Sequence, residues 1–126
     1  MAVYGFVDDS GSEPSQPVYV LGGLILPAEA WPIFAADWSH VLSSAPKIDH
    51  FKGSEVWDSR KGPFAGLTTK ERSAKVDSLA DVIFTYKPLS VSARVEWPIF
   101  KQFSNRYNLD EEFNDPYFFL FFALIG

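Results

Sequence analysis

Val3-Tyr4-Gly5-Phe6-Val7-Asp8-Asp9-Ser10-Gly11-Ser12 is the stretch that decides how this chain folds. A run of strand-forming residues ends in two adjacent carboxylates, a turn rich in Ser and Pro follows, and a second apolar run covers residues 18–26. This order predicts a β-hairpin with strands over Val3–Asp8 and Val18–Leu26. Because aspartate is disfavoured inside a strand, the two acids indicate either a ligand site, most often for a metal ion, or an ordinary turn.

The composition indicates a single domain over residues 1–126 with a large apolar core. Of the 126 residues, 47% are hydrophobic and 17% are aromatic, which excludes a disordered chain. There is no cysteine, so disulfides and thiolate metal sites are excluded. The longest apolar run, Tyr117–Ile125, is too short for a membrane-spanning helix, which needs about 20 residues. No signal peptide is visible either, so we expect a cytoplasmic protein without a membrane partner.

The net charge bears on nucleic-acid binding. Its formal value is −5, whereas proteins that hold nucleic acid mainly by charge are basic. A negative net charge is still compatible with a metal-dependent nuclease, because the bound metal ions supply the positive charge and the carboxylates of the protein hold these ions.

A helix is predicted directly after the hairpin. Apolar residues recur every three or four positions from Trp31 to Ala45, and Pro32 lies in the first turn, where proline costs little. We expect one face of this helix to pack on the sheet. Residues 47–60 lack a clean period, which predicts a short extended piece leading into a turn.

A capping box predicts the second helix. Thr68 is followed three residues later by Glu71, and Lys87-Pro88 stops the helix that they open. Glu71 and Lys75 lie one turn apart, so we expect them to form an ion pair. One face is expected to carry the apolar residues Val76, Leu79, Ala80, Ile83 and Phe84.

The last third of the chain predicts one strand and two helices. Apolar and polar residues alternate strictly over Leu89–Glu96, the pattern of a half-buried strand. Trp97-Pro98 begins a short helix, and Asp115-Pro116 caps a final helix that is apolar all round and therefore needs cover. In the short helix, residues at four-residue steps form the expected apolar face: Ile99, Phe103 and Tyr107. The whole order fits an α/β fold with helices packed on the sheet.

Asp8, Asp9 and Glu55 are the candidate functional acids. Neighbouring strand residues point to opposite faces, so only one of the two aspartates can face a given site. Asp8 lies at the expected end of the strand and Asp9 in the turn. Glu55 lies between a Gly-Ser turn and an apolar pair, where a carboxylate either projects into a cleft or is simply solvated.

Other polar residues carry less weight. His40 and His50 are single histidines, which are more often surface or satisfied core residues than general bases. An acidic cluster near the end of the chain is explained by a helix cap and solvated side chains, although Asp110 or Asp115 also suits a metal ligand. This cluster consists of Asp110, Glu111, Glu112 and Asp115. No Walker loop, nucleophile elbow or zinc-spaced histidine pair is present, and oxygen ligands alone favour Mg²⁺ or Mn²⁺.

Three segments together resemble a known family. Phe6–Ser12, Val20–Ile25 and Phe51–Val56 are similar to the strand, Leu-Gly-Gly strand and Ser-Glu element of the bacterial and phage family called domain of unknown function 3800. Asp9 stands where the family usually has Glu, and Lys52 where many members have His. Family members also run longer and have a later strand that ends in another acid. We therefore expect this chain to match the N-terminal part of a family member, with an incomplete acid set.

The resemblance implies a ribonuclease H-like fold with a mixed sheet that opens with the hairpin. It also implies a metal-dependent nuclease that hydrolyses phosphodiester bonds of DNA or RNA, in phage defence or mobile-element biology. Asp8 and Glu55 would hold one or two Mg²⁺ or Mn²⁺ ions, with Asp9 as an additional ligand.

Two other functions stay open. The first is a non-catalytic protein-interaction module that binds a partner or self-associates through the apolar helix 116–125. The second is an actin-like ATPase, which the lack of a second glycine-rich phosphate loop disfavours.

Overall fold

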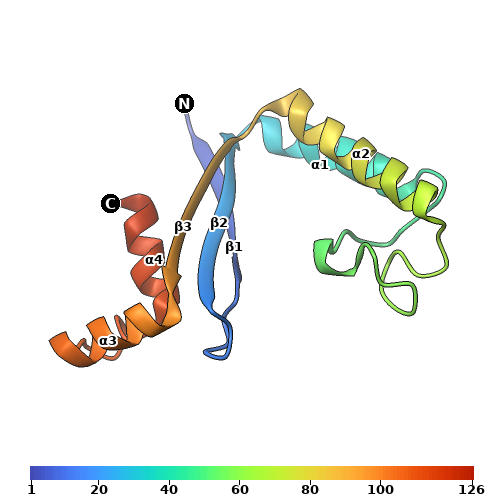
Figure 1. Cartoon of the computed structure of the whole chain (residues 1–126). Helices are drawn as coiled ribbons and strands as arrows, with labels where there is room; N and C mark the ends of the chain where they lie inside the picture. The colour runs from blue at the N-terminus through green and yellow to red at the C-terminus, as the bar shows by residue number, and fades with distance from the viewer. The chain divides into compact units, whose positions relative to one another are not determined.

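The computed structural model describes residues 1–126, which form an α/β fold of three strands and four α-helices (Figure 1). The elements follow in the order β1 (Val3–Ser10), β2 (Val18–Pro27), α1 (Ala30–Ser43), the 3₁₀ turn η1 (Gly53–Glu55), α2 (Thr69–Tyr86), β3 (Leu89–Glu96), α3 (Trp97–Tyr107) and α4 (Pro116–Ile125). The chain divides into two compact units, each described below by itself. Unit 1 holds residues 27–88 together with Met1, and unit 2 holds residues 2–26 and 89–126.

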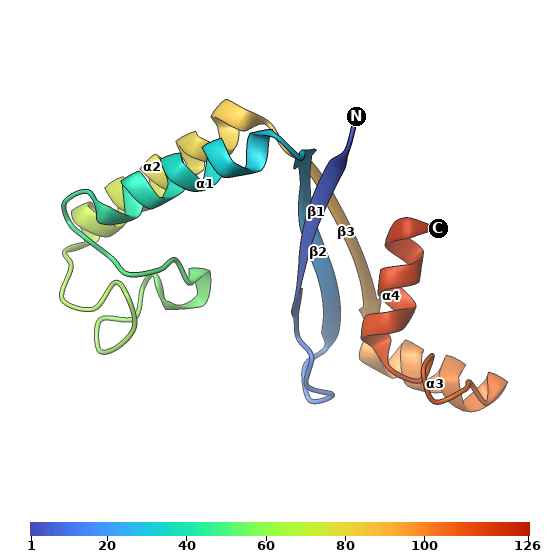
Figure 2. The same cartoon turned by 180° about the vertical axis from the view of Figure 1, so that it is seen from behind.

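The sheet belongs to unit 2 and has the strand order β1-β2-β3 (Figure 2). In the β2–β3 pair, Val18 lies opposite Glu96 and Ile25 opposite Leu89. The predicted strand Leu89–Glu96 is thus confirmed. The expectation of a mixed sheet is wrong, because each strand pairs with the one before it in sheet order and runs antiparallel to it.

Strand β1 is longer than its predicted range. It continues through Asp9 and Ser10, so the expectation that Asp9 lies in the turn is wrong. Contacts of the residues that follow the two aspartates explain the longer strand. The Trp97 indole Nε1 donates to the Gly11 carbonyl at 2.8 Å, and the backbone then turns at Gly11, whose φ is 75°. A positive φ of this kind suits glycine because it has no Cβ.

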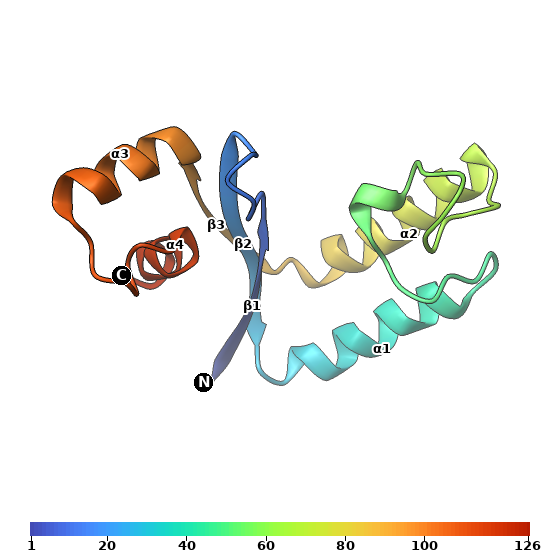
Figure 3. The same ribbon diagram turned by 90° about the horizontal axis from the view of Figure 1, so that it is seen from below.

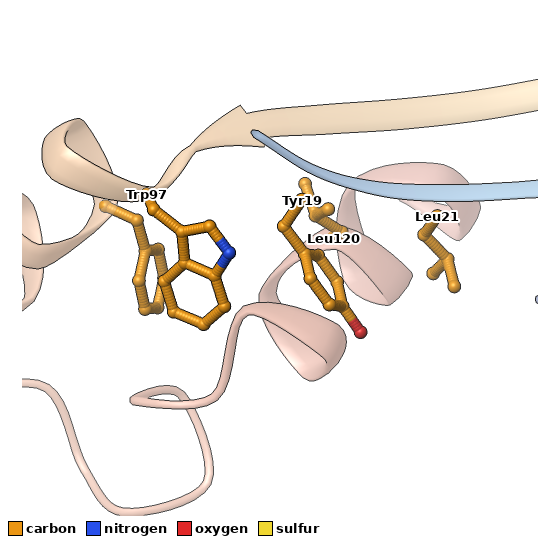
Figure 4. Packing of buried hydrophobic residues seen from close by; sticks show 5 residues of the cluster. Tyr19, Leu21, Trp97 and Leu120 are labelled. Carbon is orange, nitrogen blue, oxygen red and sulfur yellow. The ribbon is translucent and has the colours of Figure 1, made fainter. Parts of the chain in front are cut away.

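The core of unit 2 lies on one face of the sheet. Alternation along the strands turns odd-numbered residues of β2 and β3 toward α3 and α4, both of which contact β3. Figure 4 shows the buried side chains that meet there from β2, α3 and α4. These side chains are Tyr19, Leu21, Trp97, Phe100 and Leu120.

Unit 1 is built on the α1–α2 pair (Figure 3). The buried residues Ile48, Val56, Phe64 and Leu79 form its core. The apolar face of α1, which the sequence assigned to the sheet, packs here through Trp38, Val41 and Leu42. This apolar face is therefore covered by α2 and by the segment between the two helices.

Two buried cations hold unit 1 together. Lys75 donates its ammonium protons to the carbonyls of Val41 and Ser44 at the end of α1. Arg72 donates to the carbonyls of Val56 and Leu67. The expected Glu71–Lys75 ion pair is wrong, because Glu71 completes the capping box with Thr68. The predicted apolar face is also rotated: Arg72, Lys75, Leu79 and Val82 are buried, while Phe84 is 72% exposed.

Helix α3 also turns a different face inward. It buries Trp97, Phe100 and Ser104, whereas the predicted face of Ile99, Phe103 and Tyr107 is exposed. Helix α4 buries Pro116 and Leu120 and exposes Phe118, Phe122 and Ile125. None of the helices has the length and apolar character that crossing a membrane requires.

Candidate functional site

The two aspartates of β1 face opposite sides of the sheet. Both are exposed residues of the strand, and the Asp9 amide donates to Asp8 Oδ1 at 2.9 Å. Asp9 is among the groups that raise the pKa of Tyr19, and strand alternation places it on the face that α3 and α4 cover. By strand alternation Asp8 then points to the other face.

Asp9 and Asp115 both influence the buried phenol of Tyr19 in unit 2. Burial comes first among the causes that raise the pKa of Tyr19 to about 12, and the charges of Asp9 and Asp115 follow. The Tyr19 residue is only 3% exposed. Two carboxylates from distant parts of the sequence thus both act on the charge state of this phenol.

The position of Asp115 follows from its role as a helix cap. It precedes Pro116, and its Oδ1 accepts from the Tyr117 amide at 2.9 Å. The cap uses Oδ1 and keeps the carboxylate at the positive end of α4. The predicted cap is confirmed, and the structure adds its proximity to Tyr19.

Glu55 lies in unit 1 and already has a cationic partner. It ends η1, the 3₁₀ turn of residues 53–55, which lies within the segment predicted to be a short extended piece leading into a turn. Its Oε1 accepts from Lys52 Nζ at 2.8 Å, and its side chain is 17% exposed. Gly62, with a φ of 83°, lies against this carboxylate, and a Cβ there would come within 2.1 Å of Glu55 Oε2. The tight turn thus holds Glu55 in one place.

The expected pairing of Asp8 with Glu55 joins residues of the two units. Because the two residues belong to different units, this pairing stays a prediction. Within unit 2, Asp9 and Asp115 both influence Tyr19, and strand alternation directs Asp8 to the opposite face.

The remaining candidates have structural roles or none. The backbone carbonyl of His40 accepts from Ser43 Oγ and Ser44 Oγ at the end of α1, and His50 is exposed in a loop. The backbone carbonyl of Asp110 accepts from the amides of Phe113 and Asn114, which forms the turn before α4. Glu111 and Glu112 are exposed within that turn.

The Asp9–Asp115 pair suits Mg²⁺ in its donor chemistry. No group of three or more His, Asp or Glu side chains gathers in a way that could hold a metal ion. Mg²⁺, however, usually keeps several waters and binds through one or two carboxylates together with substrate phosphates. Two carboxylates beside a phenol provide hard oxygen donors of this kind.

Sequence reasoning missed Tyr19 as a member of this group. It reads as one apolar position among many in the second strand. The pairing register of the two hairpin strands is the signal that could have identified it. In a hairpin that is closed at Gly11, Tyr19 lies on the same face as Asp9 and close to it. Tyr19 is also the one phenol in an otherwise apolar strand, so its hydroxyl is placed beside the acid.

Comparisons with known proteins add no relative: no family model matches this chain, and no match is found among the curated proteins or the solved structures.

Proposed function

We propose that this protein is a Mg²⁺- or Mn²⁺-dependent nuclease that hydrolyses phosphodiester bonds of DNA or RNA, built on a ribonuclease H-like fold. The observation that carries the proposal is that Asp9 and Asp115, which are far apart in the sequence, both raise the pKa of the buried Tyr19. The resemblance of three segments to the domain of unknown function 3800 family supports the same reaction class and a role in phage defence or mobile-element biology.

Each residue of the group has a definite task in this proposal. Asp9 presents a carboxylate from the sheet, and Asp115 presents one from the start of α4. Tyr19 donates its hydroxyl proton to Asp9 and so fixes the orientation of that carboxylate. A bound divalent ion supplies a nucleophilic water at neutral pH and stabilises the charge that develops on phosphate oxygens.

Asp8 and Glu55 make up the alternative ligand set, as the resemblance implies. The two sets predict the same reaction but different sensitive residues. Asp8 belongs to the same strand end as Asp9, so a substitution there changes the same local charge while sparing the group at Tyr19. This makes the two aspartates matched controls for each other.

Cleavage of labelled DNA and RNA oligonucleotides with Mg²⁺ and with EDTA tests the proposal. We expect cleavage that needs the metal and that falls by at least about 100-fold in Asp9→Asn and Asp115→Asn, since losing a metal ligand removes most transition-state stabilisation. Asparagine keeps the helix cap at position 115, so the second variant should fold normally. Loss of activity in Asp8→Asn and Glu55→Gln alone would assign the ion to the other set. Metal-independent cleavage, or none in the wild type, would contradict the proposal.

A protein-interaction module is the second candidate, and an apolar groove in unit 2 favours it. The groove of about 290 Å³ lies between the sheet and α4, and its lining includes Val3, Val7, Phe121, Leu124 and Ile125. Ile125 is 66% exposed and Val3 is 55% exposed. Uncovered apolar surface of this kind marks an association site, for which the simplest occupant is a second copy of this chain.

Light scattering after size exclusion distinguishes this candidate. Self-association through the groove predicts a dimer that Ile125→Glu converts to a monomer. Ile33→Glu, at a residue that is 58% exposed on α1 and outside the groove, is the matched control and should leave the dimer intact. A wild-type monomer at all concentrations would contradict self-association.

A further inference from the structure

The outer face of α3 carries aromatic and basic side chains that the core does not use. Ile99, Gln102, Phe103, Arg106 and Tyr107 line a shallow hollow along this face, which we call the α3 strip. Ile99 is 56% exposed, Phe103 39% and Tyr107 58%. The opposite face of the same helix provides the buried Trp97 and Phe100. The α3 strip therefore lies outside the buried core of unit 2.

The aromatic groups of the strip contact one another in a tilted arrangement. The ring centroids of Phe103 and Tyr107 lie 4.8 Å apart, with their planes inclined at 47°. The Arg106 guanidinium carbon lies 5.5 Å from the centroid of the Tyr107 ring. A second contact, between Phe103 and Phe119 at 5.8 Å, fixes the first ring against α4. These side chains are thus partly ordered before any ligand binds, which lowers the entropy cost of binding.

The charge of α3 is opposite to that of the chain as a whole. The chain has 16 acidic and 11 basic residues, yet α3 contains Lys101 and Arg106 and no carboxylate. The nearest acids in the sequence are Glu96, which is the N-cap residue of α3, and Asp110 to Glu112, which follow after the helix has ended at Tyr107. A helix of this composition attracts a polyanion locally, even though the whole protein repels one.

We infer that the α3 strip binds single-stranded nucleic acid, with bases stacking on Phe103 and Tyr107 and a phosphate paired with Arg106. Single strands fit this surface better than a duplex does, because their bases are free to stack on side chains. At 1.5 Å per residue, the strip extends about 12 Å from Ile99 to Tyr107, which is enough for a short segment only. The inference rests on the proposed function insofar as it names the form of the substrate.

Fluorescence anisotropy in EDTA separates this inference from the proposed reaction, because no cleavage takes place without metal. The probes are fluorescein-labelled oligothymidylate and oligouridylate of about 12 nucleotides, and a duplex of the same length. We expect both single strands to bind more tightly than the duplex. Tyr107→Ala and Arg106→Gln should each weaken binding at least about fivefold. Arg106→Gln should also make the slope of log K against log salt shallower by about 0.7, the value for one phosphate contact on a single strand.

Matched controls come from α2, in the other unit. Phe84→Ala removes an aromatic side chain that is 72% exposed, and Lys70→Gln removes one positive charge from an exposed helical site. Both should bind as the wild type does, and circular dichroism should show that every variant keeps its helices. Equal weakening in the controls, a preference for the duplex, or no binding of either single strand would overturn the inference. If one single strand alone is bound, it identifies the substrate as DNA or RNA. If cleavage occurs while the α3 variants bind normally, only this inference fails.

Discussion

At the scale of single residues, the position of Asp9 is what changes the expected site. The sequence alone places it beyond the strand, whereas in the structure it belongs to β1 and raises the pKa of Tyr19. Strand alternation then separates Asp9 from Asp8, although they are neighbours in the chain. Such a shift cannot be read from the run Asp8-Asp9-Ser10-Gly11, because the contact of Trp97 with Gly11 that accompanies the longer strand spans most of the chain.

The pKa of Tyr19 gives a prediction at this scale. Asp9→Asn removes one of the charges that raise this pKa, so it should fall from about 12 toward the ordinary value of 10.0. Tyrosinate absorbance during alkaline titration measures the change, and Tyr19→Phe identifies the signal by removing it. Asp8→Asn is the matched control and should leave the titration unchanged. An equal effect of both variants would show that Asp9 is not the acid beside Tyr19.

The same pKa predicts how stability depends on pH. A hydroxyl with a folded pKa of about 12 and an unfolded pKa of 10.0 keeps its proton more firmly in the folded state. Its contribution is fully present below pH 10 and is lost as the pH rises through the folded pKa, because the unfolded state then binds fewer protons. Urea denaturation at several pH values should show a steeper loss for the wild type than for Tyr19→Phe in this interval.

At the scale of elements, features that depend on nearby residues could be predicted from the sequence, whereas the buried faces of the helices could not. The strand Leu89–Glu96 and the caps at Thr68 and Asp115 depend on neighbours within a few residues, and all three are confirmed. The inward faces of α2 and α3 depend on partners from distant segments. In α2, Lys75 is buried because it donates hydrogen bonds to the carbonyls at the end of α1. A cation therefore occupies a position of the buried face at which the periodicity of the sequence predicts an apolar residue.

Lys75 therefore carries the prediction at this scale. Lys75→Met keeps the length of the side chain but leaves the carbonyls of Val41 and Ser44 without their donor. We expect the free energy of unfolding to fall by about 2 kcal/mol, the usual value of hydrogen bonds to a charged group. Chemical denaturation measures this loss. Lys70→Met, on the exposed side of the same helix, should change stability by less than about 0.5 kcal/mol. An unchanged free energy of unfolding in Lys75→Met would show that the buried ammonium group does not stabilise unit 1.

At the scale of the whole molecule, the sequence predicts the class of fold better than its sheet. Composition and element order lead to an α/β protein, and the structure has that class with an antiparallel three-stranded sheet. Strand direction depends on which strands pair, and periodicity carries no information on pairing. The candidate site shares this property: its two acids, Asp9 and Asp115, come from opposite ends of the chain.

The central claim is that Asp9 and Asp115 hold a divalent cation, and Mg²⁺ titration followed by thermal melting tests it most directly. Binding to the folded state alone raises stability, by about 2.7 kcal/mol when the free ion reaches 100 times its dissociation constant. The account predicts a melting temperature that rises across millimolar Mg²⁺ in the wild type and in Asp8→Asn, and that stays constant in Asp9→Asn and Asp115→Asn. A wild-type melting temperature that does not respond to Mg²⁺, or a response that survives in both Asp9→Asn and Asp115→Asn, would contradict it.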